Sequence, residues 1–111
     1  TFDIANSTVY RELVGCTKEV IITDRKPAGT VMIEAPTLAT KDYFSTAQTE
    51  TTGNLTFLHG TTAGNRVTLN ALQCDISNPS YADQDGIQML NIPYLAVPTT
   101  AGNDEMSLVF T

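Results

Sequence analysis

The residues that could carry chemistry are few in this chain of 111 residues. It has one histidine, His59, which precedes Gly60 in a stretch typical of a strand end and a turn. Hydrolytic sites of the serine or cysteine type need a histidine held between a nucleophile and an orienting group, and one histidine does not reveal such partners. We therefore interpret His59 as a partly exposed hairpin residue.

The two cysteines, Cys16 and Cys74, do not form a CxxC pair and allow one disulfide at most. The only basic neighbour of Cys16 is Lys18, whereas a reactive thiolate needs a clearly electropositive setting. We interpret both cysteines as small buried hydrophobic residues and expect two free thiols under denaturing, non-reducing conditions. One disulfide is the alternative.

A fragment of a calcium-binding loop is visible at Asp83, Asp85 and Gly86. The full pattern needs an oxygen ligand two residues before Asp83 and a glutamate seven residues after Asp85. Tyr81 and Ile92 occupy those positions. We interpret the three residues as a turn, because Asp bonds to nearby backbone and Gly accepts a positive φ.

The other polar clusters are also interpreted as turns. Asn103, Asp104 and Glu105 form an acidic turn, and the glycines make neither a GxGxxG nor a GxxxxGK(S/T) phosphate loop. The sequence therefore predicts no catalytic residue, no cofactor-binding residue and no metal ligand. An enzyme is the weakest of the interpretations.

The charge balance restricts the class of partner. The net charge is −6 and the pI is about 4.4, and Lys18, Arg25 and Lys26 lie close to acids. A surface that grips nucleic acid phosphates is not expected. No apolar run approaches ~20 residues, so no membrane span is expected, and no signal peptide is visible. The chain starts at Thr1, so we expect a processed product or part of a longer chain.

Short alternating stretches must position these residues. The length predicts one β-rich domain covering 1–111, and threonine favours strands. We expect hairpins between 19–24 and 30–35, between 55–59 and 66–74, and between the twelve residues after Gly86 and the end of the chain. The last of these is expected to be the strongest local structure.

Within these strands the alternation predicts which side chains share a face. One face of the strand after Gly86 is expected to carry Leu90, Ile92, Tyr94 and Ala96. In the strand 66–74, Ala71 and Cys74 are expected to point to opposite faces. We expect Ile87 or Leu90, together with Leu108 or Phe110, to lie in the buried face of the sheet.

One segment is predicted to be helical, and a second is compatible with either a helix or a strand. The stretch 38–48 is the best helix candidate, with Thr37 as N-cap and Leu38, Tyr43 and Phe44 near one stripe. Residues 9–14 fit either a short helix or a strand over 8–14. The predicted fold is mainly β: an antiparallel β-sandwich or half-open barrel with one short flanking helix.

The C-terminal stretch resembles the C-terminal strands of tail tube and related virion structural proteins of long-tailed bacteriophages. Tyr81, Asp83 and Asp85–Gly86–Ile87 carry the resemblance, followed by Pro93, Pro98 and the run Gly102–Asn103–Asp104–Glu105. The run Gly64–Asn65–Arg66–Val67 and the stretch 25–36 add to it. The resemblance covers about the last fifty residues and rests on turns and alternation. Tail tube subunits are commonly longer than this chain.

The resemblance implies a subunit of a virion tail, assembled in the host cytoplasm. Six subunits would form a ring through their sheet edges, and rings would stack into a hollow tube for DNA, joined to other tail proteins. An acidic lumen would repel DNA phosphates and let the DNA slide. Tail terminator, tail tip and baseplate proteins share similar folds, so a related tail component is equally implied. No catalytic residue is carried over.

A second class of function is a β-sandwich adhesin or a carbohydrate- or protein-binding module. Such a module would carry clustered exposed aromatic side chains. The sequence has eight aromatic residues, and we expect most of them to lie in the core.

Overall fold

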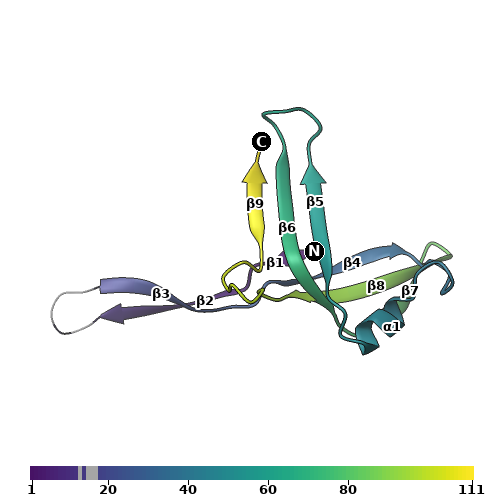
Figure 1. The fold of residues 1–111 in the computed structure, drawn as a ribbon, viewed down its shortest axis with the longest axis horizontal. Coiled ribbons are helices and arrows are strands. Elements are labelled where there is room, and N and C mark those ends of the chain that lie inside the picture. The colour runs from purple at the N-terminus through teal and green to yellow at the C-terminus, as the bar shows by residue number, and fades with distance from the viewer. Residues whose placement is uncertain (13, 15–17) are drawn as a thin grey trace.

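The structure is a computed structural model that describes residues 1–12, 14 and 18–111. Its described part has nine strands and one helix: β1 (Phe2–Asp3), β2 (Asn6–Glu12), β3 (Lys18–Arg25), β4 (Ala28–Glu34), α1 (Tyr43–Gln48), β5 (Gly53–His59), β6 (Val67–Ile76), β7 (Ser80–Gln84), β8 (Ile87–Ala96) and β9 (Ser107–Phe110). The expected mainly β class is confirmed: a curled, half-open antiparallel sheet with one short helix beside it (Figure 1).

Seven strands form this sheet in the order β1-β4-β8-β6-β5, with β7 added to β8 and β9 added to β6. The sheet curls because its two long strands change partners along their length. β8 pairs with β7 over residues 87–91 and with β6 over 94–96, and β6 pairs with β9 over 67–70 and with β8 over 74–76. As a result, β5, β6 and β9 stand across the direction of β4 and β8 (Figure 1).

Pro93 lies at the point where β8 changes partners. Its carbonyl accepts a hydrogen bond from the Ser77 amide at 3.0 Å. The nitrogen of a strand residue points to the same side as its carbonyl, so the missing N–H of Pro93 falls in the gap between β7 and β6. Proline is tolerated there because it interrupts no continuous ladder.

The core lies where β8 crosses β6. The expected face of β8 is confirmed, because Leu90, Ile92, Tyr94 and Ala96 are all buried. The expectation that Ala71 and Cys74 point to opposite faces of β6 is wrong, because both are buried in the same cluster. A bulge in the β5–β6 pairing places one extra residue of β6 between Ala71 and Cys74, and this residue reverses the alternation of faces.

The contact between Tyr94 and Thr1 depends on a glycine on the neighbouring strand. Gly29 is its cross-strand partner, and the Tyr94 hydroxyl donates to the Thr1 carbonyl at 2.7 Å. A Cβ on Gly29 would lie 2.0 Å from that carbonyl oxygen and 2.6 Å from the Tyr94 hydroxyl. Only glycine leaves room for this contact.

Two of the three expected hairpins are wrong in their partners. The hairpin over 55–59 and 66–74 is confirmed as β5–β6. However, the strand over 19–24 pairs with β2 and not with β4, and β9 pairs with β6 and not with β8. Pro27 is buried and its carbonyl accepts the Ala96 amide at 2.8 Å, so the chain crosses extended from β3 to the sheet instead of turning back.

The helix is shorter than the expected stretch 38–48. It begins after Asp42, whose side chain accepts the Ser45 amide at 3.0 Å, while Thr37 accepts the amides of a separate turn. Asp42 is the better-placed cap. Residues 9–12 belong to β2, so the helical alternative is wrong there, while residue 13 lies outside the described residues. No helix in the described part of the chain is long and apolar enough to span a membrane.

Candidate functional site

The residues singled out for chemistry do not come together. His59 is exposed at the end of β5, opposite Val67. Across the described ranges 1–12, 14 and 18–111, no three His, Cys, Asp or Glu side chains gather in a way that could hold a metal ion.

The Asp83–Gly86 segment is a turn, as expected. Asp85 and Gly86 both have positive φ, 55° and 83°, and form the two-residue loop between β7 and β8. The Asp83 carboxylate accepts the Gly86 amide at 3.2 Å. This is the Asp-Gly geometry that suits a tight hairpin.

The acids of the second turn have structural partners. Asp104 accepts hydrogen bonds from the amide and the hydroxyl of Thr99, and these bonds hold the pKa of its carboxyl below its usual range. Glu105 is buried and forms an ion pair with Arg25 at the end of β3, with Nη2 and Oε2 2.5 Å apart. Lys18 and Lys26 pair with Glu12 and Asp24.

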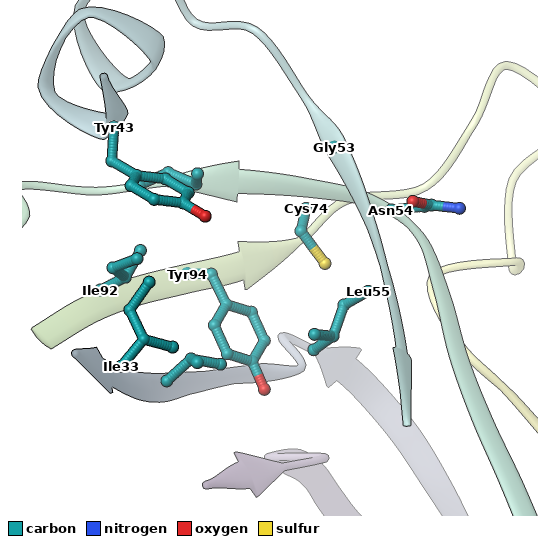
Figure 2. Close-up of a pocket in the computed structure, with 10 residues that line it drawn as sticks. Ile33, Tyr43, Gly53, Asn54, Leu55, Cys74, Ile92 and Tyr94 are labelled. Carbon is teal, nitrogen blue, oxygen red and sulfur yellow. The ribbon is translucent and has the colours of Figure 1, made fainter. Parts of the chain in front are cut away.

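Cys74 borders a small apolar cavity of about 220 Å³ between β4, β5, β6, β8 and the helix. Figure 2 shows its sulfur directed toward Leu55 and Tyr94, while Asn54 points away. Burial raises the pKa of the Cys74 thiol, so the thiol is not activated. Cys74 is free, as expected; Cys16 lies outside the described residues.

The molecule exposes much more surface than a compact monomer. Its accessible surface is 7862 Å² at 12.0 kDa, against roughly 6,000 Å² expected for a compact chain of that mass. The radius of gyration is 18.1 Å and the extents are 62 × 37 × 31 Å, where ~13 Å is the usual radius for this length. Large apolar side chains contribute to this exposed area, and two groups of them define the surfaces described next.

The first surface is the inner face of β5, β6 and β9, defined here as Phe57, Val67, Leu69, Leu108 and Phe110. Cross-strand pairing places these side chains in two rows on one side of the sheet. The two rows extend the core along β5 and β6, beyond the cross-strand pair Leu55 and Ala71. Phe57 is 60% exposed, Leu108 49% and Phe110 70%. The expectation that Leu108 or Phe110 lies buried is therefore wrong for the single chain.

A hollow of about 380 Å³ lies at the base of the inner face. Its walls include Phe57 and Leu69 from the inner face, and Phe2 and Tyr94 from the crossing strands. The inner face is therefore the open side of the half-barrel. In a closed barrel or sandwich a second sheet would cover it.

The second surface is the hairpin face, defined as Tyr10, Val20 and Ile22 on β2 and β3. Tyr10 lies opposite Val20, and Ile22 is two residues along on the same side. These side chains are 57%, 66% and 56% exposed. Within the described ranges, β2 and β3 contact each other but no further strand and not the helix, and the hairpin projects away from the sheet (Figure 1).

Comparison with known proteins adds no relative. No family model matches the chain, and no match was found among curated proteins or solved structures. Sequence reasoning missed both surfaces, because alternation marks an apolar face without saying whether the chain itself covers it.

Proposed function

We propose that this chain is a structural subunit that joins copies of itself through sheet edges, as a tail tube subunit of a long-tailed phage or a related tail component. The observation that carries the proposal is the chemistry of the two outer strands of the β5–β6–β9 unit. The strands GNLTFLH and SLVF contain no charged residue and no proline. Monomeric proteins usually protect exposed edges with lysine, proline or a bulge that twists the edge away.

The directions of the two edge strands are compatible with the repeated addition of further copies of the chain. β5 and β9 both pair antiparallel with β6, so they run parallel to each other. A copy related by rotation would bring its β5 beside the β9 of its neighbour as a parallel pair. Such a head-to-tail contact uses two different edges, and it closes into a ring where the rotation closes. A six-membered ring is the arrangement that the phage resemblance implies.

The net charge of −6 per chain fits a conduit for DNA. A ring of acidic subunits would repel phosphates along its lumen and so would not retain the DNA. Assembly through backbone pairing and apolar contacts should resist moderate salt, because neither depends on exposed ion pairs.

One observation favours the carbohydrate- or protein-binding alternative. Four of the eight aromatic residues are exposed, Tyr10, Phe57, Tyr81 and Phe110, which is more than expected from the sequence. Phe57 and Phe110 share the inner face. Their neighbours in the rows are mainly aliphatic, whereas a sugar site also needs polar groups that fix hydroxyls.

Sedimentation of the full-length protein over a concentration series, at low and high salt, tests the proposal. Rings or tubes, visible also in electron micrographs, are the expected result at both salt concentrations. A protein that stays monomeric at high concentration and binds a glycan would contradict it in favour of the alternative.

The edge itself is tested by Leu58→Lys. Leu58 is exposed on β5, and a lysine there reproduces the usual protection of an edge. Leu72→Lys is the control, because Leu72 is equally exposed but lies on β6, which is inside the sheet and not at its edge. Only Leu58→Lys should weaken assembly; equal behaviour of the two variants would contradict edge pairing.

A further inference from the structure

We propose that the β2–β3 hairpin of one copy docks its hairpin face onto the inner face of a second copy. The inference rests on the proposed function and names the contact that accompanies edge pairing. It starts from two apolar surfaces that the chain leaves open, one on a projecting arm and one on a concave sheet.

The hairpin needs a partner for its own stability. An isolated two-stranded hairpin is marginal in water, and this hairpin exposes Tyr10, Val20 and Ile22 on one face. In the described chain, the only ion pair or side-chain hydrogen bond that joins it to the rest of the molecule is Arg25–Glu105 at its base, where Ile22 and Arg25 also border a hollow with the turn at Asn103. The hairpin projects away from the sheet (Figure 1), and in the described chain β2 and β3 contact none of β5, β6 and β9, so the hairpin does not cover the inner face of its own chain.

The excess surface matches the area that such a contact requires. The chain exposes about 1,900 Å² more than a compact monomer of its mass. A standard interface buries about 800 Å² on each partner. In a head-to-tail assembly each chain offers one hairpin and one inner face, so two patches of that size would account for the excess.

The charge distribution favours a second copy as the occupant. Residues 6–26 carry four of the six cationic residues and three acids, a net charge of +1; the other residues carry two cations and nine acids, a net charge of −7. The hairpin therefore approaches the body of another copy with weak attraction instead of repulsion. Added salt should slow the association more than it weakens the final contact.

A complementation experiment on the full-length protein tests the contact. Val20→Asp places a charge in the hairpin face and leaves the inner face intact, while Val67→Asp does the reverse on β6, away from the edge strands. Val9→Asp is the matched control, because Val9 lies on the opposite face of the same hairpin. Val20→Asp and Val67→Asp should each raise the concentration needed for assembly about tenfold or more, and Val9→Asp should not.

The mixture of the two defective variants distinguishes docking from general damage. The hairpin of the Val67→Asp copy can still dock onto the intact inner face of the Val20→Asp copy, so a 1:1 species that grows no further is expected in sedimentation. If the wild type assembles and Val20→Asp assembles equally well, or if the mixture stays unassociated, the docking proposal is wrong while the proposed function stands. If the wild type does not assemble, both fail.

Discussion

The β8 strand and the β2–β3 hairpin carry the same alternation of large apolar side chains, and the fold treats them in opposite ways. On β8, Tyr94 is 6% exposed beneath the crossing strands; on the hairpin, Tyr10 projects into solvent. The contrast shows that alternation specifies a strand and its two faces. Whether a face is covered depends on where the neighbouring strands lie, and no strand among the described residues lies over the hairpin face.

The largest effect should come from making one change in both regions. Tyr94→Ala removes a buried ring and its hydrogen bond to Thr1, so the free energy of unfolding should fall by about 3–5 kcal/mol. Tyr10→Ala removes an exposed ring and should cost less than about 1 kcal/mol in the monomer. Chemical denaturation at concentrations that keep the protein monomeric measures both. Similar losses would mean that the hairpin packs against its own chain.

A smaller effect is expected at the glycine that faces Tyr94. Gly29→Ala forces a methyl group into the Thr1 carbonyl and should cost about 1–3 kcal/mol. Gly53→Ala is the control, because a Cβ there meets nothing within 4 Å. If Gly29→Ala were as harmless as Gly53→Ala in the same denaturation experiment, the contact between Tyr94 and Thr1 would not exist in solution.

A still smaller loss of stability is expected at the ion pair that joins the hairpin to the rest of the molecule. Glu105→Gln leaves Arg25 without its carboxylate in a partly buried site and should cost ~1–2 kcal/mol. Glu12→Gln breaks the exposed pair with Lys18 and should cost less than about 0.5 kcal/mol. The same order is expected in the local opening of β3 measured by hydrogen exchange. A reversed order would remove Arg25–Glu105 as the anchor of the hairpin.

The smallest effect is a dependence on pH that belongs to the core alone. Burial raises the pKa of the Cys74 thiol, so the folded state holds the thiol proton more tightly than the unfolded state. The resulting stability is present below the ordinary thiol pKa and is lost as pH rises through the folded pKa. Cys74→Ala should flatten the decline of stability above about pH 8.5. An unchanged slope in denaturation midpoints would place the effect elsewhere.

Local features of this fold could be predicted from the sequence, and strand partners could not. Asp85–Gly86 fixes a tight turn through the dihedral angles of two residues, and the alternation of β8 fixes its buried face. The partner of β3 depended on Pro27, whose buried carbonyl bonds to β8 far along the chain. The face of Cys74 depended on a bulge that leaves no mark in the alternation.

The candidate surfaces were harder to predict for the same reason. Phe110 has the spacing of a core residue and lies on the inner face, yet nothing in the described part of the chain covers it. In the proposed assembly a second copy would bury such a residue, and a single sequence does not contain that information.

Amide hydrogen exchange of the full-length protein, followed from monomeric to assembling concentrations, tests most directly whether a second copy covers the open surfaces. Protection should rise with concentration in β2, β3, β5 and β9, while β4 and β8 should be protected throughout. If sedimentation shows assembly but exchange in the hairpin and in β5 and β9 does not change, these surfaces are not the interface and the assembly proposed here is wrong.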